Sequence, residues 1–437
     1  MKRQKYSKSQ YPPIKCERSE QNANAVSLNA SDSEPKCEQS EPKCERSEQN
    51  FTPSPFYSQI CRTFAPSFCN LKSVMDKNFY CVIMAGGVGA RFWPLSRTHT
   101  PKQFIDILGD GESLIQKTYR RFQEICPKEN IYIITNRDYA HLVREQLAGI
   151  QDEQIVLEPA RRNTAPCIAY ANFKIKAKNP DAVIVVAPSD HIILKEDVFK
   201  DVILNGLKFV KENDKLLTIG IRPSYPNTGY GYIQYNEERS YGWNASIYDV
   251  KIFTEKPELE VAKQFVESGE FLWNAGIFMW SLKEIEKAFN RYLPEVNDLF
   301  RQGEGLYNTS AEQSFINATY QVCRNISIDY GVMEKAANVC VYAADFGWSD
   351  LGTWGSLYEI SEKDENSNVV AGNRVNTYGT KGCIINVPSE KAVVLQGMED
   401  FIIVDNDNVL LICKKENEQQ IRQYVNDVEL DYGSKYI

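Results

Sequence analysis

Apolar residues follow two alternating patterns along most of this chain. Short apolar runs have the length of buried β-strands, and the segments between them carry apolar residues every three or four positions, as on one face of a helix. The strand candidates are residues 80–84, 131–135, 183–187 and 216–221, and the helix candidates are residues 114–125, 140–147, 164–178 and 198–212. Strands that alternate with helices build a sheet covered on both faces. The pattern therefore predicts an α/β fold with a doubly wound, mostly parallel, Rossmann-like sheet.

The pattern changes after residue 360. Before that point, further strands are expected at 252–254, 276–280 and 339–343, with helices at 261–267 and 285–290. Beyond it, short apolar runs separated only by turns occupy residues 382–387, 392–395, 401–404 and 409–413, and a helical pattern follows at 418–428. We therefore predict one domain over residues 75–360 and a small C-terminal β module over residues 361–437. The module could also pair two copies of the chain in a homodimer.

The first 74 residues differ from the rest in composition. The string KCERSEQN occurs at residues 15–22 and again at 43–50, with few branched apolar residues around it. Such a low-complexity segment cannot offset its ordering entropy by burial. We expect residues 1–74 to form a disordered extension without a part in catalysis, and the folded domain to begin near Met75.

Charge and composition disfavour several classes of protein. The formal net charge is -8, whereas proteins that bind nucleic acid or anionic membranes usually carry a basic excess. The sequence contains no long apolar run and no secretory signal pattern, so we expect a cytoplasmic protein without a nucleic-acid or membrane partner. The 12 cysteines include no C-x-x-C pair and indicate reduced core residues. Only three histidines are present, which disfavours a Ser-His-Asp hydrolase.

A glycine-rich turn follows the first predicted strand. The string AGGVGAR at residues 85–91 can bring backbone N–H groups close to a phosphate. An arginine stands where the third glycine of a dinucleotide-binding G-x-G-x-x-G motif would be, and no Gly-Lys-Ser/Thr follows as in a Walker loop. The chain continues with FWPLSR and then PKQF. Arg91, Arg97 and Lys102 could therefore hold a triphosphate and neutralise a departing pyrophosphate.

This block resembles the signature of the mannose-1-phosphate guanylyltransferase family, also called GDP-mannose pyrophosphorylases. Glucose-1-phosphate relatives share the glycine-rich loop but typically lack FWPLSR and PKQF, which favours mannose and guanine. The resemblance extends from residue 79 to at least residue 358. Its further segments are EPARRNTAPCIA from Glu158, APSDH up to His191, NTGYGYI from Asn227, EKP from Glu255, WNAGIF from Trp273 and FGWSDLGTW from Phe346. No histidine follows His191, so we expect the monofunctional form, without a phosphomannose isomerase module.

The resemblance implies a magnesium site and two substrate sites. Asp190 follows a predicted strand, at the sheet edge where open α/β folds bind ligands, and Asp350 lies in a glycine-flanked turn. By resemblance these two carboxylates hold Mg²⁺, which prefers oxygen ligands. The residues expected to bind the nucleotide are Ala85, Gly86, Gly87, Gly89, Arg91, Lys102, Glu158, Asn163 and Thr164, of which the last two also suit helix capping. The residues expected to bind the sugar phosphate are Gly229, Tyr230, Glu255, Lys256, Asn274 and Gly276. The expected catalytic residues are Arg91, Lys102, Asp190 and Lys256.

The expected reaction transfers GMP from GTP to mannose 1-phosphate and releases pyrophosphate. A phosphate monoester has a second pKa near ~6 and needs no general base at neutral pH, which agrees with the scarcity of histidine. One alternative is a glucose- or fucose-type nucleotidyltransferase that uses UTP, dTTP or GTP. Another is a catalytically silent regulator that binds a sugar nucleotide, which would have lost a metal carboxylate. A nicotinamide-dependent oxidoreductase is disfavoured by the arginine in the loop.

Overall fold

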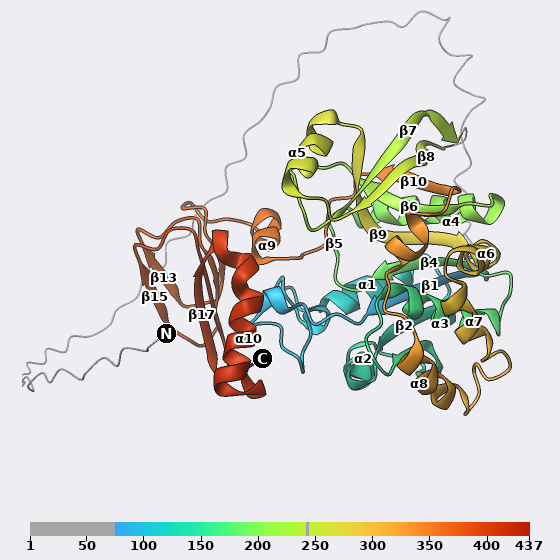
Figure 1. Cartoon of the computed structure of the whole chain (residues 1–437). Helices are drawn as coiled ribbons and strands as arrows, with labels where there is room; N and C mark the ends of the chain where they lie inside the picture. Colours follow the sequence, from blue (N-terminus) through green and yellow to red (C-terminus); the bar gives the residue numbers. More distant parts are fainter. Residues whose placement is uncertain (1–74, 242–243) are drawn as a thin grey trace, which may run out of the picture. The chain divides into compact units, whose positions relative to one another are not determined.

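The predicted strands lie side by side in one nine-stranded sheet in the computed structural model, which describes residues 75–241 and 244–437 (Figure 1). The extension expected over residues 1–74 lies outside the described residues. In spatial order the strands are β3 (Ile155–Glu158), β2 (Ile131–Asn136), β1 (Phe79–Ala85), β4 (Val183–Pro188), β9 (Phe271–Ser281), β6 (Leu216–Ile221), β10 (Val339–Ala344), β8 (Asn244–Glu255) and β7 (Gly231–Tyr241).

One half of this sheet is parallel and the other half is mixed. β3, β2, β1 and β4 pair in parallel, and β6 pairs in parallel with β10. Between these groups β9 runs antiparallel to both β4 and β6, and β7 and β8 form an antiparallel hairpin at one edge. The α/β fold is thus confirmed, with parallel pairing confined to those two groups. A hairpin joins consecutive strands directly, whereas parallel neighbours need a crossover connection.

Alternate residues of the strands pack against helices on opposite faces of the sheet. In β1, Cys81 and Ile83 face one apolar core while Tyr80 and Val82 face the other, as the two-residue period of a strand requires. The first core includes α1 (Leu114–Phe122), α2 (Ala140–Gln146) and α4 (Glu196–Glu212). The second includes α3 (Thr164–Lys176), α6 (Leu282–Tyr292), α7 (Pro294–Arg301) and α8 (Glu312–Val322), and α5 (Leu259–Ser268) packs on β7 and β9. None of the described helices combines the length and apolar character that a membrane crossing needs.

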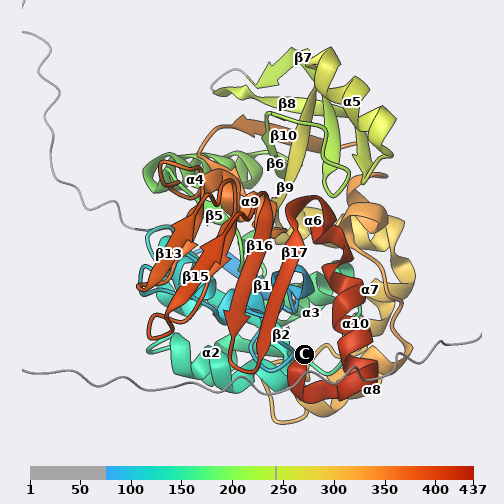
Figure 2. The same ribbon diagram turned by 90° about the vertical axis from the view of Figure 1, so that its left-hand side faces the viewer.

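Beyond α9 (Trp354–Ile360) the chain coils into two small sheets (Figure 2). One contains β12 (Val369–Ala371), β14 (Ile384–Asn386) and β16 (Phe401–Asn406) in parallel, and the other pairs β13 (Val375–Tyr378) in parallel with β15 (Val393–Gln396). β17 (Val409–Lys414) turns back on β16 and leads through η7 (Lys415–Gln420) to α10 (Ile421–Tyr432). The predicted β-strands and closing helix are present. Parallel strands joined without helices make the module a short solenoid, which the sequence pattern did not reveal.

The C-terminal module and the α/β domain share one apolar core. Phe92 and Trp93, which follow β1, pack in the same cluster as Trp354 of α9, Ile402 of β16 and Ile421 of α10. Figure 1 shows α10 beside the segment after β1, and the two are in contact. All five side chains are at most 4% exposed. The glycine-rich turn therefore ends in a segment whose position depends on the C-terminal module.

Arg97 is the polar centre of this contact. Its side chain is 3% exposed and donates hydrogen bonds to the carbonyls of Pro94 at 3.2 Å and Asn406 at 2.8 Å, and to the side chain of Asn408 at 2.9 Å. The Asn406 side chain in turn donates to the Pro94 carbonyl at 2.9 Å. Because its Nε donates to its own segment and its two terminal nitrogens donate to Asn406 and Asn408, Arg97 is not available to a triphosphate. The expectation that Arg97 holds phosphate is therefore wrong.

Truncation of Ile421 should weaken the whole fold. Ile421 is fully buried in the shared core, and an Ile→Ala change in such a position costs about 2–5 kcal/mol. We expect Ile421→Ala to lower the free energy of unfolding by that amount in urea titrations. Leu430→Ala is the matched control, because Leu430 lies in the same helix but is 84% exposed, and it should change stability by less than about 0.5 kcal/mol. Equal effects of the two changes would contradict the shared core.

Candidate functional site

The glycine-rich loop after β1 is held in shape by side chains of the PKQF and FWPLSR segments. The Gln103 side chain donates to the carbonyls of Ala85 and Gly87, both at 3.0 Å. The Ser96 hydroxyl donates to the carbonyl of Gly89 at 2.6 Å. Loop carbonyls are therefore fixed by protein donors on both sides of the turn. A loop held in this way needs no ligand to keep its conformation.

Glycine is needed at different positions of the loop for different reasons. Gly89 has a φ of 75°, and a Cβ there would lie 2.5 Å from Cβ of Lys102, so only glycine lets the two segments approach. A Cβ on Gly87 would meet no atom within 4 Å. A Cβ on Gly86 would have Oε2 of Glu158 as its nearest neighbour, at 3.7 Å. Gly89 thus serves packing, whereas the backbone at Gly86 and Gly87 is open to a ligand.

Lys102 joins three separate segments of the chain. Its ammonium forms an ion pair with Oδ2 of Asp190 at 2.8 Å and donates to the carbonyls of Asp350 at 2.9 Å and Leu351 at 2.7 Å. These contacts use all three N–H donors of the lysine, which is 3% exposed. We expected this cation to face the triphosphate. In the structure it instead links the glycine-rich loop to the residues after β4 and to the turn after β11 (Trp348–Ser349).

Asp190 and Asp350 therefore lie at one edge of the sheet. Asp190 comes just before β5 (Ile192–Ile193) and Asp350 just after β11 (Trp348–Ser349), and these two short strands pair. Burial disfavours the charged form of Asp190. The ammonium of Lys102, together with His191 and a hydrogen bond from its own backbone, outweighs that effect and holds the pKa of Asp190 below its usual value. Asp190 is thus a carboxylate at neutral pH.

The two carboxylates fit a hard divalent cation. Asp350 accepts both of its hydrogen bonds, from the Tyr230 hydroxyl at 2.7 Å and the Gly352 amide at 2.9 Å, through Oδ1. Oδ2 of Asp350 and Oδ1 of Asp190 accept no hydrogen bond from any other described residue and would be the oxygens open to a cation. Within the described residues no three histidine, cysteine or acidic side chains cluster closely enough to form a metal cage. Two carboxylates plus substrate phosphates and water are the usual ligands of Mg²⁺ at phosphoryl-transfer sites.

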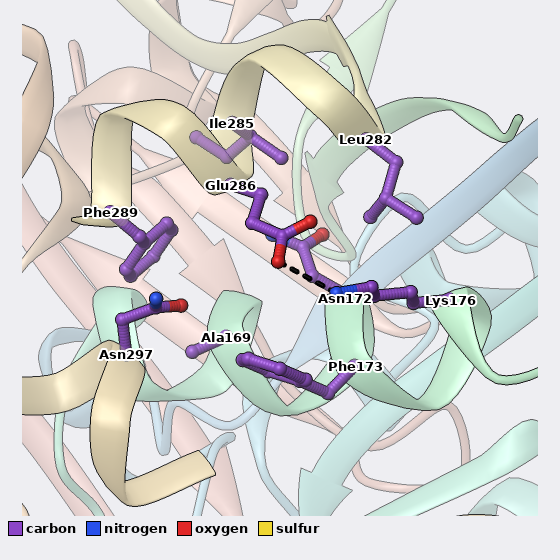
Figure 3. Close-up of a pocket in the computed structure, with 9 residues that line it drawn as sticks. All are labelled: Ala169, Asn172, Phe173, Lys176, Leu282, Ile285, Glu286, Phe289 and Asn297. Atoms are coloured by element: carbon purple, nitrogen blue, oxygen red, sulfur yellow. Dashed lines mark hydrogen bonds and ion pairs between the residues drawn. The ribbon is translucent and has the colours of Figure 1, made fainter. Parts of the chain in front are cut away.

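A cleft of about 1330 Å³ opens beside Asp350. Arg91, predicted for the nucleotide, lines it together with Gly229, Tyr230 and Lys256, predicted for the sugar phosphate. The other residues predicted for the two substrates do not line this cleft. A second hollow, between α3, α6 and α7, has room for only about 10 Å³ and is lined mainly by apolar side chains (Figure 3). That volume holds at most one water molecule. The large cleft is therefore the candidate active site.

Arg91 is the cation of the loop that remains unpaired. Within the described residues its guanidinium has no hydrogen bond or ion pair, and its buried Nε has no partner. Burial and the neighbouring Arg422 lower the pKa of Arg91. An arginine keeps its charge under such shifts. The carboxylates of Asp350 and Glu418 act on its pKa in the opposite direction, so Arg91 is a charged group near acidic residues but without a direct partner in the part of the chain that the structure describes.

The residues predicted for the sugar phosphate form a connected set. Lys256 pairs with the carboxylate of Glu255, and the Lys256 amide donates to the Tyr230 carbonyl at 3.2 Å. The side chain of Glu255 is 8% exposed. A Cβ atom on Gly231 would lie only 2.4 Å from Oε2 of Glu255, which is too close. Gly231 is thus required for Glu255 to occupy this position. Through its hydrogen bond to Asp350, Tyr230 connects this set to the carboxylate pair.

Asn274 is fixed by protein groups on both sides of its amide. Its Oδ1 accepts from the Thr218 hydroxyl at 2.9 Å and the Gly276 amide at 3.2 Å, and its Nδ2 donates to Asp329 at 3.0 Å. Burial, followed by the charge of Glu255, raises the pKa of Asp329 to about 6. Asp329 was not predicted, since an aspartate in the string SIDYG carries no motif of its own. It places a second acid beside Glu255.

The residues predicted for the nucleotide base fall into two groups. Glu158 lies at the loop, since its Oε2 faces Gly86, while its Oε1 accepts from the Tyr320 hydroxyl at 3.0 Å. Burial raises the pKa of Glu158 to about 7. Asn163 and Thr164 are not brought into the large cleft by any contact. Asn163 caps α3 by accepting from the Thr164 amide at 2.9 Å, and the Thr164 hydroxyl accepts from the Ile328 amide at 2.9 Å.

Known proteins resemble this chain over nearly all of its described length. Residues 80–367 match the nucleotidyl transferase family, and residues 372–428 match the MannoseP isomerase/GMP-like beta-helix domain. The chain is 37% identical to mannose-1-phosphate guanylyltransferase 2 of Escherichia coli O157:H7 over 83% of this chain and 76% of that protein. It is 35% identical to the mannose-1-phosphate guanylyltransferase of Klebsiella pneumoniae over 81% of this chain and 75% of that protein.

A solved structure supports the same assignment. The crystal structure of mannose-1-phosphate geranyltransferase from Thermus thermophilus superposes with a TM-score of 0.72 at 30% identity, covering 80% of this chain and 99% of that one. The β-helix match agrees with the parallel coil of β12 to β16. Both the sequence motifs and the fold thus lead to one conclusion. The chain belongs to the nucleotidyl transferase family and, within it, to the mannose-1-phosphate guanylyltransferases.

Proposed function

We propose that this protein transfers GMP from GTP to α-D-mannose 1-phosphate, giving GDP-mannose and pyrophosphate, with Mg²⁺ as its cation. The observation that carries the proposal is the set of bonds from Lys102, which brings the carboxylate residues Asp190 and Asp350 together beside the glycine-rich loop. Relatives named mannose-1-phosphate guanylyltransferase support the choice of mannose and guanine.

The reaction needs two polyanions to meet at one phosphorus atom. An oxygen of the mannose phosphate attacks the α-phosphorus of GTP, the bond from that phosphorus to the bridging oxygen of the β-phosphate breaks, and pyrophosphate leaves with the electron pair. No proton has to move, because the attacking phosphate is mostly a dianion at neutral pH. The contribution of the protein is therefore positioning and charge compensation. Arg91 and Lys256, which line one cleft, supply positive charge for the two anions.

Asp190 and Asp350 are the proposed ligands of Mg²⁺. The cation would neutralise charge on the phosphates during transfer. Lys102 is the proposed positioning residue for both carboxylates, because its ammonium contacts Asp190 directly and the backbone of Asp350. Tyr230 orients Asp350 from the sugar side by its hydrogen bond of 2.7 Å.

Glu158 is the proposed reader of guanine. Its Oε2 is the nearest atom to the open side of Gly86. We infer that the base of a nucleotide held by the loop lies beside it. A carboxylate accepts hydrogen bonds only, and guanine presents adjacent N–H donors on its N1 and N2 atoms, whereas adenine has an acceptor at N1. Glu255 and Asn274 are the proposed contacts to the hexose hydroxyls, with Gly229 and Gly276 giving access to the backbone.

The proposal predicts which substrates are used. With Mg²⁺, GTP and mannose 1-phosphate, the purified protein should release pyrophosphate and form GDP-mannose. UTP, dTTP and ATP in place of GTP, and glucose 1-phosphate or fucose 1-phosphate in place of mannose 1-phosphate, should give lower kcat/KM values. Product identification by mass spectrometry together with a pyrophosphate assay measures both. Higher kcat/KM with UTP and glucose 1-phosphate would support the glucose-type alternative, and absence of any product would support a silent regulator.

Replacement of Asp350 should remove turnover while keeping the fold. In Asp350→Asn the amide oxygen can still accept from Tyr230 and Gly352, but the charge that would hold Mg²⁺ is lost. We expect kcat to fall by about 10²–10³, as when one group that stabilises transition-state charge is removed. The unfolding midpoint should stay close to that of the wild type. Asp345→Asn is the charge-matched control, since Asp345 is 84% exposed, and wild-type kcat in Asp350→Asn would exclude the metal role.

Replacement of Glu158 should relax the choice of base. Glu158→Gln keeps the size of the side chain but turns one acceptor into a donor, so kcat/KM for GTP should fall about 10- to 100-fold, the cost of unpaired polar groups. ITP lacks the N2 amine, so its kcat/KM should fall less than that of GTP in this variant. Glu153→Gln is the control, because Glu153 is 62% exposed and near in sequence. An unchanged ratio of GTP to ITP activity would rule out base reading by Glu158.

The same residue predicts a pH dependence. Because burial raises the pKa of Glu158 to about 7, the carboxylate is the main form above that pH and the neutral acid below it. Only the carboxylate accepts from both guanine donors, so KM for GTP should rise as pH falls from about 8 to about 6. The phosphates of the substrates also titrate in this range. Comparison with Glu158→Gln separates the titration of Glu158 from that of the phosphates. In this variant, KM for GTP should lack the part of its rise at low pH that Glu158 causes.

A further inference from the structure

The C-terminal module contributes side chains to the cleft of the α/β domain. Glu418 and Gln419 of η7 and Arg422 in the first turn of α10 line the same space as Arg91 and Asp350. None of these three was singled out by the sequence. The cleft therefore has one wall that the nucleotidyltransferase domain does not supply.

That wall is held in place by bonds on both sides of Arg422. Ile421 is fully buried in the core shared with Phe92, which belongs to the segment after the glycine-rich loop. The Glu418 carboxylate accepts from the Gly355 amide at 2.8 Å, in the first turn of α9. At the chain end, Trp93 donates from its indole nitrogen to the carbonyl of Tyr436 at 2.7 Å. The backbone at Arg422 is therefore fixed relative to the loop.

Two guanidinium groups line this part of the cleft without a direct partner among the described residues. Within the described residues, neither Arg91 nor Arg422 forms an ion pair or a hydrogen bond, although both line the cleft. Burial lowers the pKa of Arg91 most, and the charge of Arg422 lowers it next. The two guanidinium groups therefore repel each other, and the carboxylates of Asp350 and Glu418 offset part of that effect. The repulsion of two cations is offset when an anion lies between them. A guanidinium pair of this kind suits a polyphosphate, since each can form two parallel hydrogen bonds to phosphate oxygens.

We propose that Arg422 is a substrate-binding residue that contacts, together with Arg91, the β- and γ-phosphates of GTP, which become the pyrophosphate product. The inference rests on the proposed function and adds a residue of the C-terminal module to the triphosphate site. Pyrophosphate leaves and GDP-mannose lacks the γ-phosphate, so the contact discriminates between the two products. Arg422 therefore strengthens the binding of GTP and pyrophosphate and contributes almost nothing to the binding of GDP-mannose.

Arg422→Ala tests this role through ligands that differ in their phosphates. The KM for GTP, the KM for pyrophosphate in the reverse reaction, and the Kd of Mg²⁺-pyrophosphate from calorimetry should each rise about 10- to 100-fold, as expected for lost hydrogen bonds to a charged group. The Kd of GDP-mannose should stay unchanged. Arg422→Lys keeps the charge but not the planar fork, and should fall between wild type and Arg422→Ala.

Lys435→Ala is the matched control, since it removes one positive charge from an exposed position near the end of the same chain segment and does not line the cleft. It should leave all four constants unchanged. An unchanged Kd for Mg²⁺-pyrophosphate in Arg422→Ala, or an equal loss of affinity for GDP-mannose, would overturn the inference. Calorimetry measures pyrophosphate binding without turnover, so it tests Arg422 separately from the reaction. If the wild-type protein bound pyrophosphate but made no GDP-mannose, the proposed function would be overturned and the role of Arg422 in binding would not.

Discussion

The buried ammonium of Lys102 is the interaction on which the site depends. A charge that is 3% exposed is tolerable only when every donor has a partner, and Lys102 finds them in the Asp190 carboxylate and two backbone carbonyls. These partners come from the end of β4 and from the turn after β11, which are far apart in sequence. The same bonds that satisfy the lysine therefore bring together the two acidic residues. In the folded state, the contacts of Lys102 therefore also hold the residues of the proposed metal site together.

A consequence is that the cations near the loop have divided tasks. Lys102 and Arg97 have their donors occupied by protein oxygens, so their charge serves the structure. Arg91 and Arg422 have no such partners within the described residues and line the cleft. In the sequence, Arg91, Arg97 and Lys102 are equivalent, because each is a cation in the block after β1. Their burial and hydrogen-bond partners in the folded protein distinguish these three cations. Only a side chain with unsatisfied donors near solvent can bind an incoming anion.

Features that depend on neighbouring residues in the sequence could be predicted, whereas features that depend on contacts between distant segments could not. Within residues 79–221, β1, β2, β4, β6 and the helices α1 to α4 were predicted because hydrophobic period is a local property, whereas the short strands β3 and β5 were not. Asp190 and Asp350 were chosen as candidates because each stands in a recognisable motif. The partners of Arg97 could not be predicted, since Asn408 lies 311 residues further along the chain. Asp329 and Arg422 lie in segments with no motif of their own. Their neighbours Glu255 and Arg91 are contributed by other elements, and only tertiary structure brings them together.

Leu351 shows how the C-terminal module and the carboxylates are mechanically connected. Its carbonyl accepts from Lys102 at 2.7 Å, while its side chain is fully buried in the core shared with β16 and α10. Leu351 has a φ of 47°, a conformation that costs of order 1–3 kcal/mol for a residue with a side chain. Burial of the side chain and the lysine bond offset that cost together, so loss of either leaves the backbone free to relax. Since the adjacent residue is Asp350, the orientation of this carboxylate depends on packing against the C-terminal module. The apolar core of the module therefore supports the backbone next to Asp350 through Leu351.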